Sequence, residues 1–200
     1  MKPYRIAAIP TVYKGRQYRS RLEARWAAFF DLLGWKAEYE PYDLGRWSPD
    51  FLLRGRDGIE LLVEVKPITT FDQEVGDKAV AACFEKGLSD SLSGILLVGV
   101  GPTIHGRGVI VGWHGTLYSD EPKADWGDSG LGWLLADTHP EIWPDLINPD
   151  PSGQGWSGVL TGIWGRGTPH DIRCYQDHTM KLWAEATNRV QWFGKAAPSE

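Results

Sequence analysis

Residues 46–53 read RWSPDFLL and residues 59–67 read IELLVEVKP, and these two stretches decide the fold of the chain. Both are rich in the aliphatic and aromatic residues that favour strands. Residues 54–58, RGRDG, lie between them and consist largely of turn formers. The pattern therefore predicts two neighbouring strands joined by a short turn.

Charged residues interrupt the second of these strands where a buried strand should stay apolar. Because side chains alternate between the two faces of a strand, Glu64 and Lys66 share one face and Val63 and Val65 share the other. Asp50 begins the partner strand directly after Pro49, where a bend could bring its carboxylate toward Glu64. Two carboxylates and a lysine at strand ends can bind a divalent cation and position a water. The alternative is a surface Glu64–Lys66 pair on an edge strand, with Asp50 a turn residue.

Pro49-Asp50 and Glu64-Val65-Lys66 together resemble the two halves of the motif of the PD-(D/E)XK nuclease superfamily. The resemblance extends back to residues 19–26, RSRLEARW, and residues 39–41, YEP, and covers about the first half of the chain. The arrangement of these motifs is similar to that of small, mostly phage-borne nuclease-like proteins. The resemblance implies a restriction-endonuclease-like core and a magnesium-dependent nuclease that hydrolyses phosphodiester bonds, with DNA as the expected substrate. Manganese is expected to substitute for magnesium.

The resemblance also implies roles for individual residues. Asp50, Glu64 and the Val65 carbonyl are the expected metal ligands, and Lys66 is expected to orient the attacking water or neutralise the phosphorane. Glu23 matches the helix carboxylate that completes the metal shell, which makes Asp50, Glu64, Lys66 and Glu23 the expected catalytic set. Ser20 and Glu23 are also spaced as a capping box, which explains Glu23 without any metal.

Positive charge is concentrated at the N-terminal end of an acidic chain. The net charge is −5, yet residues 1–25 hold seven basic side chains and one acid, so this segment carries +6 and the remainder −11. Such a distribution suits a phosphate-facing patch. The expected nucleic-acid contacts are Arg16, Arg19, Arg21 and Arg25. The alternative is a solvated helix start with a basic arm, and solvent is also the default environment for Lys78 and Lys86.

The order of predicted elements is helix, three strands, helix, strand. Helical spacing of apolar residues runs from Ser20 to Leu33 and ends at Gly34. The remaining elements are expected at residues 36–41, 47–53, 60–66, 72–87, 95–100 and 108–113. This order predicts an α/β fold with a mixed central sheet flanked by helices, and residues 1–114 would form that nuclease-like core.

The chain changes character after the predicted core. Residues 115–169 are rich in glycine, proline and tryptophan, which predicts a loop-rich insertion packed on the core, with a helical turn at 131–136 and a strand at 158–164. Its tryptophans could stack unpaired bases or anchor loops to the core. Residues 170–200 are expected to form a C-terminal helix, from about 171 to 193, and a tail. That helix would pack across the sheet or form a partner interface, as in a homodimer.

Bulk composition excludes several classes. Hydrophobic content is 42% and charged content 24%, ordinary values for a globular protein. No apolar run is long enough to cross a bilayer and no signal peptide begins the chain, so no membrane partner is expected. Cys83 and Cys174 lack a metal-ligand spacing, which predicts a reduced, cytoplasmic setting. Two rival functions remain: a catalytically silent nucleic-acid-binding or anti-defence phage protein on the nuclease fold, and a structural phage component.

Overall fold

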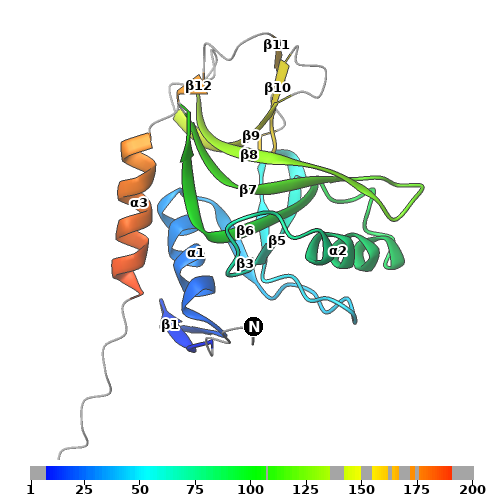
Figure 1. The fold of residues 1–200 in the computed structure, drawn as a ribbon, viewed down its shortest axis with the longest axis horizontal. Coiled ribbons are helices and arrows are strands. Elements are labelled where there is room, and N and C mark those ends of the chain that lie inside the picture. The colour runs from blue at the N-terminus through cyan, green and yellow to red at the C-terminus, as the bar shows by residue number, and fades with distance from the viewer. Residues whose placement is uncertain are drawn as a thin grey trace, which may run out of the picture.

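The computed structural model describes residues 8–106, 108–135, 142–149, 155–161, 164–166, 172–173 and 176–190. Figure 1 shows a strongly curled sheet with helices packed around it. The helices are α1 (Arg21–Leu32), α2 (Gln73–Glu85) and α3 (Gln176–Arg189), with a short 3₁₀ turn at Arg56–Gly58. The strands are β1 (Thr11–Tyr13), β2 (Arg16–Tyr18), β3 (Lys36–Tyr39), β4 (Phe51–Arg54), β5 (Glu60–Val65), β6 (Gly94–His105), β7 (Gly108–Leu117), β8 (Ala124–Leu135), β9 (Ile142–Pro149), β10 (Gly155–Gly158), β11 (Trp164–Arg166) and β12 (Ile172–Arg173).

Within these residues the strands form a ten-stranded mixed sheet and a separate two-stranded sheet, β1–β2. The large sheet has the order β11-β10-β9-β8-β7-β6-β5-β4-β3, and β12 pairs with β8. β5 and β6 are parallel, because the chain crosses over through α2 between them, and the other pairs are antiparallel. The expected mixed α/β fold with helices beside a central sheet is confirmed at this level.

The two faces of β5 contribute to two separate apolar cores. Leu61, Val63 and Val65 lie in the core that contains α1 and α3, whereas Leu62 packs in the core that contains α2. Glu64 is buried too and lies on the α2-facing side by strand alternation. Helices therefore cover both faces of this part of the sheet, and the predicted alternation holds.

α1 forms where the sequence predicts it. Ser20 is the N-cap, and its hydroxyl accepts a hydrogen bond from the Glu23 backbone N–H at 3.1 Å. Gly34, with φ of 74°, follows the last turn, where a left-handed residue ends the helix. Trp26 and Phe29 are fully buried and contact the Trp183 ring of α3, at centroid distances of 4.7 and 5.5 Å. The long aromatic stripe of α1 is therefore buried by a second helix as well as by the sheet.

The described part of residues 115–169 continues the sheet rather than forming a loop-rich insertion. Residues 131–135, expected in a helical turn, belong to β8, and residues 159–161, expected in a strand, form a turn after β10. Glycines suggested loops, but several fit strands because a neighbour fills the space of their missing side chain. A Cβ on Gly115 would lie 2.9 Å from the Trp126 ring. The β1–β2 hairpin precedes α1, with Lys14 and Gly15 at its turn.

Three further expectations lie partly or wholly outside the described residues. Residues 191–193, the predicted end of the last helix, and Cys174 belong to the parts of the chain that the structure leaves out. The same holds for Lys2 and Arg5 of the basic N-terminal segment. Among the helices that are described, none is long and apolar enough to cross a membrane.

Candidate functional site

The strand register brings Asp50 and Glu64 to the same end of the β4–β5 pair. Phe51 is opposite Val63, and Asp50 directly precedes Phe51 while Glu64 directly follows Val63. Both carboxylates are buried, with 2% of Asp50 and 4% of Glu64 exposed. Charged residues are rarely this buried without partners, so the groups around them indicate what the site can do.

Asp50 has one fixed neutral partner and one charged partner. Its Oδ2 accepts a hydrogen bond from the Val65 backbone N–H at 2.8 Å. Its Oδ1 forms an ion pair with the Arg19 guanidinium, which also pairs with Glu40 at 2.9 Å. The Arg19 side chain is 55% exposed. Asp50 is thus held from the inside by the backbone of β5 and covered from the solvent side by an arginine.

Glu64 is held in the same way, from inside by a neutral donor and from outside by a cation. The indole Nε1 of Trp47 donates to Glu64 Oε2 at 2.8 Å, and the Lys66 ammonium forms an ion pair with Oε1. The Lys66 side chain is 39% exposed. The predicted placement of Glu64 and Lys66 on one face is confirmed. Nothing in the sequence pattern indicated that Trp47 orients the glutamate.

Glu23 lies in the first turn of α1, and its carboxylate accepts three hydrogen bonds. Oε1 accepts from the Ser20 hydroxyl at 2.8 Å, and Oε2 accepts from the Tyr39 hydroxyl at 2.5 Å and from the Arg19 backbone N–H at 3.2 Å. The last contact is to the residue before the N-cap, whereas a capping box binds the N–H of the N-cap itself, and the same Arg19 N–H also donates to the Tyr39 hydroxyl at 3.1 Å. Burial, reinforced by the bond to Glu23, raises the pKa of the Tyr39 phenol above its usual value. Both interpretations of Glu23 are therefore compatible with its position.

The carboxylates are close enough to influence one another electrostatically. Burial, together with the charges of Glu64 and Glu23, raises the pKa of Asp50 to about 7 against the opposing effects of the Val65 N–H and Lys66. Burial alone would lower the pKa of Arg19, but its bond with Tyr39 and the charges of Asp50 and Glu23 raise it overall. We call Glu23, Glu40, Asp50, Glu64, Arg19 and Lys66 the carboxylate site. When all six groups are ionised, its net charge is −2.

The residue types at this site suit a magnesium ion, but their side chains are not arranged around one. Carboxylate and carbonyl oxygens are the ligands that magnesium prefers, and the net charge of the site matches a divalent cation. No group of three or more His, Cys, Asp or Glu side chains in the described residues is arranged to hold a metal. The reason is visible in the contacts, since Asp50 faces Arg19, Glu64 faces Lys66, and Glu23 faces Tyr39. Val65, the fourth expected ligand, contacts the site through its N–H.

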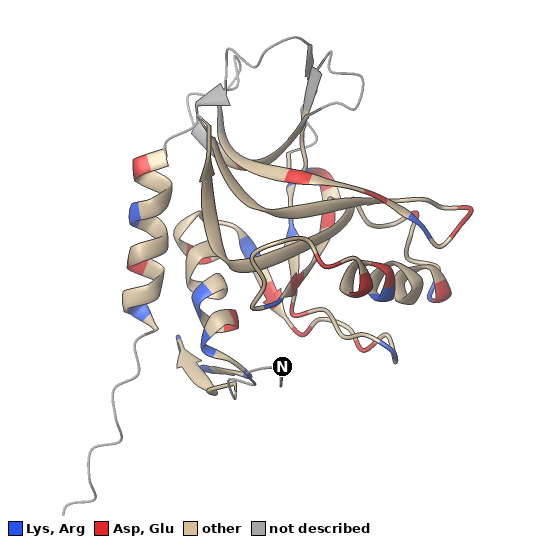
Figure 2. Cartoon of the chain, viewed as in Figure 1, with Lys and Arg blue, Asp and Glu red and all other residues tan. Residues whose placement is uncertain are grey.

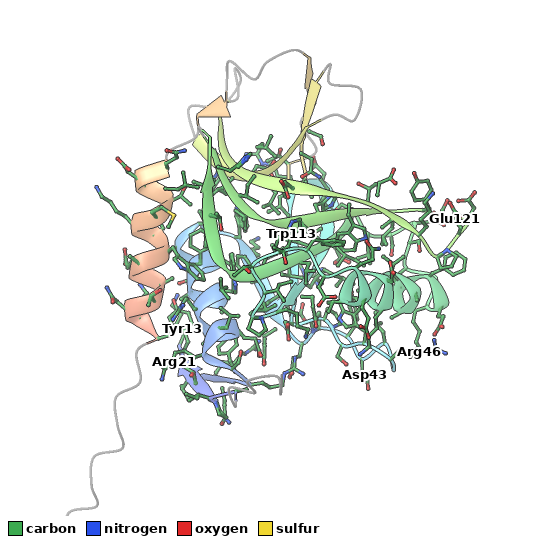
Figure 3. All side chains as sticks on the ribbon, in the orientation of Figure 1. Tyr13, Arg21, Asp43, Arg46, Trp113 and Glu121 are labelled. Carbon is green, nitrogen blue, oxygen red and sulfur yellow. The ribbon has the colours of Figure 1, made fainter. Side chains whose placement is uncertain are left out.

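The four arginines expected to bind nucleic acid do not form one surface. Arg19 covers the carboxylate site, and Arg16 lies on the β1–β2 hairpin. Arg25 lies over the Trp183 ring at 5.5 Å, and burial together with the charge of Arg21 lowers its pKa. Arg21 begins α1, and Figure 3 shows it on the side of the molecule away from Asp43 and Arg46. Figure 2 shows basic positions along α1 and charges of both signs on α2.

Comparisons of the chain with protein-family models, with curated proteins and with solved structures gave no match.

Proposed function

We propose that the chain is a metal-dependent nuclease that hydrolyses phosphodiester bonds, with DNA as its expected substrate. The observation that carries the proposal is the burial of Asp50 and Glu64 together at one end of the β4–β5 pair, with Lys66 beside them. Two buried carboxylates side by side are costly to keep, and groups with a perturbed pKa, such as Asp50, concentrate at functional sites.

The surrounding topology supports the same proposal. α1, the antiparallel strands β3–β5, the crossover helix α2 and the parallel strand β6 follow one another in the order expected for a restriction-endonuclease-like core. The four carboxylates of the site and Lys66 belong to this segment. The later strands β7–β11 extend the sheet away from it and would be the C-terminal elaboration.

Asp50, Glu64, the Val65 carbonyl and Glu23 would hold magnesium in this proposal. When bound, the ion supplies Lewis-acid chemistry that lowers the pKa of a water and stabilises charge on the phosphate. Trp47 fixes the orientation of the Glu64 carboxylate, and the Val65 N–H fixes that of Asp50. The Lys66 ammonium, released from Glu64, would donate a hydrogen bond to the attacking water or to the developing phosphorane. Arg19, released from Asp50, would contact a substrate phosphate.

A nucleic-acid-binding protein without catalysis is the second candidate. Arg19 and Lys66 already neutralise Asp50 and Glu64, so the site could be a stable ion-pair cluster that never takes up a metal. The two functions differ in their dependence on magnesium. A binder should bind nucleic acid equally well with a chelator present and should cut nothing.

Cleavage of single-stranded and duplex DNA with magnesium, compared with cleavage in the presence of EDTA, tests the proposal. Asp50→Ala, Glu64→Ala and Lys66→Ala should each abolish cleavage and leave a folded protein. Matched controls are Asp90→Ala and Lys86→Ala, which change exposed residues without an ion pair in the described part of the chain. If the site variants cut as well as the wild type does, the assignment is wrong. If the wild type binds but never cuts, the second candidate replaces it.

A further inference from the structure

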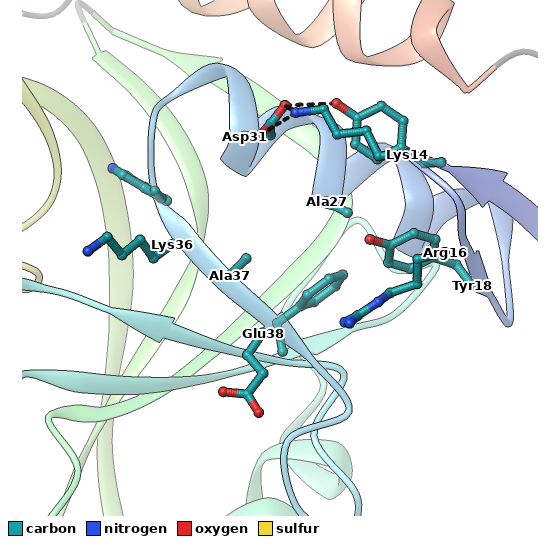
Figure 4. A pocket seen from close by; sticks show the side chains of 11 residues that line it. Lys14, Arg16, Tyr18, Ala27, Asp31, Lys36, Ala37 and Glu38 are labelled. Atoms are coloured by element: carbon teal, nitrogen blue, oxygen red, sulfur yellow. Dashed lines mark hydrogen bonds and ion pairs between the residues drawn. The ribbon is translucent and has the colours of Figure 1, made fainter.

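A groove of 480 Å³ lies between the β1–β2 hairpin, α1 and the edge strand β3. Its lining includes Arg16, Tyr18, Ala27, Lys36, Ala37 and Phe51. Figure 4 shows Arg16 and Lys36 toward opposite ends of the groove, with Ala37 between them. None of the predicted functions assigned a role to this hollow or to Lys36.

The groove exists because the hairpin and the main sheet do not pair with each other. β1 and β2 form their own sheet, and β3 is the last strand of the large one. The facing side chains are short at Ala27 on the helix and Ala37 on the strand, so they leave the space between the two sheets open. The free side of an edge strand offers unpaired backbone donors and acceptors. The groove is therefore an open channel with polar backbone along one wall.

Two positive charges in the groove lack a compensating carboxylate. Asp31 is paired with Lys14 at 2.6 Å, and Glu38 is paired at 3.0 Å with Arg54, which Glu60 shares, so both acids near the groove have cationic partners other than Arg16 and Lys36. Arg16 and Lys36 have no ion pair within the described residues, and Lys36 is exposed. Two uncompensated cations at the ends of a channel favour an extended anion over a compact one.

The groove lies next to the carboxylate site. Phe51, in the groove wall, directly follows Asp50 in β4. The Tyr18 ring, also in the wall, lies 4.5 Å from the Tyr39 ring, and the Tyr39 hydroxyl donates to Glu23. A polymer whose cleaved bond lay at Asp50 could thus pass over Tyr39 and Tyr18 into the groove.

We propose that this groove receives the sugar-phosphate backbone of nucleic acid on one side of the cleaved bond, with Arg16 and Lys36 contacting its phosphates. The inference rests on the proposed function, because that function supplies the reason for a phosphodiester polymer at Asp50. It adds a second binding region and assigns Lys36 to it. It also separates Arg16 from Arg21 and Arg25, which lie near each other on α1, where Arg25 lies over the Trp183 ring of α3.

Binding of a fluorescein-labelled oligonucleotide, followed by anisotropy in EDTA over a salt series, tests the groove without catalysis. The variant Arg16→Gln/Lys36→Gln should bind about tenfold more weakly at low salt, with a salt slope lower by about 1.4–1.8, the release expected for two lost phosphate contacts. The control Lys78→Gln/Lys86→Gln removes the same charge from exposed positions on α2 and at its C-cap. It should bind within about twofold of the wild type. Measuring the binding of single-stranded and of duplex oligonucleotides shows which form the groove prefers.

A variant that fills the groove separates its shape from its charge. Ala37→Leu adds bulk on an exposed edge-strand position and changes no charge, so the thermal midpoint should be unaffected. Binding should weaken about fivefold while the salt slope stays unchanged, because no phosphate contact is neutralised. The inference is overturned if the double variant binds like its α2 control, or if the wild type binds no oligonucleotide. If the wild type shows no nuclease activity but these binding differences are observed, the proposed catalysis is wrong and the proposed binding groove stands.

Discussion

Asp50 and Asp145 are the two most deeply buried aspartates among the described residues, and their partners differ in kind. Asp145 is 0% exposed, and its carboxylate accepts from the backbone N–H groups of Leu146, Leu160 and Thr161 and from the Thr161 hydroxyl. No cation takes part in these bonds. Asp145 therefore fastens the turn after β10 to β9, and its donors are fixed parts of the fold.

Asp50 has only one such fixed donor, the Val65 N–H. Its second oxygen depends on Arg19, whose half-exposed side chain is shared with Glu40 and can leave without disturbing any backbone. Burial raises the pKa of both aspartates, but carboxylate neighbours raise it further only at Asp50. Burial and a raised pKa therefore do not identify a functional carboxylate by themselves. A replaceable partner beside like charges is the better indicator.

The largest expected difference between the two aspartates is in stability. Asp145→Ala would strand several buried donors, each costing about 1–3 kcal/mol, so the free energy of unfolding should fall by at least about 3 kcal/mol. Asp50→Ala strands only one backbone donor, the Val65 N–H, and also removes a carboxylate repelled by Glu64, so these effects oppose each other and its free energy of unfolding without metal should change by less than about 1 kcal/mol or rise. Urea unfolding in EDTA measures both. Equal losses in the two variants would show that Asp50 is as structural as Asp145.

The pH dependence of stability sharpens the same comparison. The pKa of Asp50, about 7, exceeds the value of about 3.9 in an unfolded chain, so the folded state binds more protons between these values. Stability should therefore fall as pH rises from about 4 to about 7. Asp145 acts in the same direction, because burial raises its pKa too. Burial lowers the pKa of His114 to about 4, so His114 acts oppositely below about pH 6.5.

Because these effects overlap, the measurement compares variants. The difference in thermal midpoint between Asp50→Asn and the wild type, both in EDTA, should grow in favour of the variant as pH rises from about 5 to about 7.5. Manganese at about pH 7.5 should raise the midpoint of the wild type and leave that of Asp50→Asn nearly unchanged. Parallel pH profiles of the two proteins would contradict the coupling of Asp50 to its carboxylate neighbours.

Periodicity made the centre of the site predictable. The alternation of β5 placed Glu64 and Lys66 on one face, and the spacing of Ser20 and Glu23 located the start of α1. Contacts between distant segments were not predictable, because no periodic pattern records them. Trp47 reaches Glu64 from the loop before β4, and Asp145 reaches a turn fifteen residues later. The strands after residue 115 were missed for a related reason, since Gly115 packs against the Trp126 ring and Gly158 against Asp145, and the sequence pattern indicates neither contact.

A smaller effect is expected at Arg19, the exchangeable partner of Asp50. Arg19→Ala removes the guanidinium that covers Asp50 and pairs with Glu40, so manganese should bind about threefold to tenfold more tightly, a gain of about 0.7–1.4 kcal/mol. Calorimetric titration without nucleic acid isolates this effect from substrate binding. Arg21→Ala is the control. This substitution also removes one positive charge, and Arg21 has no carboxylate contact among the described residues. Unchanged or weaker manganese binding in Arg19→Ala would mean that Arg19 does not compete for the site.

The smallest expected change in stability separates the two interpretations of Glu23. Glutamine can still accept hydrogen bonds from Tyr39 and the Arg19 N–H, and its amide can donate to the Ser20 hydroxyl oxygen, so Glu23→Gln should cost less than about 0.5 kcal/mol. A magnesium ligand, by contrast, needs the charged carboxylate. Cleavage at limiting magnesium should therefore drop about tenfold or more, the scale of losses around metal sites.

Two further variants divide the capping role from the proposed metal role. Ser20→Ala removes the N-cap and keeps the carboxylate, so it should lose about 0.5–2 kcal/mol of stability and retain most of its cleavage. Glu23→Ala should lose both, because it removes the acceptor of three hydrogen bonds and the charge together. Thermal unfolding and a magnesium titration of cleavage decide between the roles. Full cleavage by Glu23→Gln at limiting magnesium would leave Glu23 as a cap and tyrosine anchor, and Asp50, Glu64 and Lys66 would then act without it.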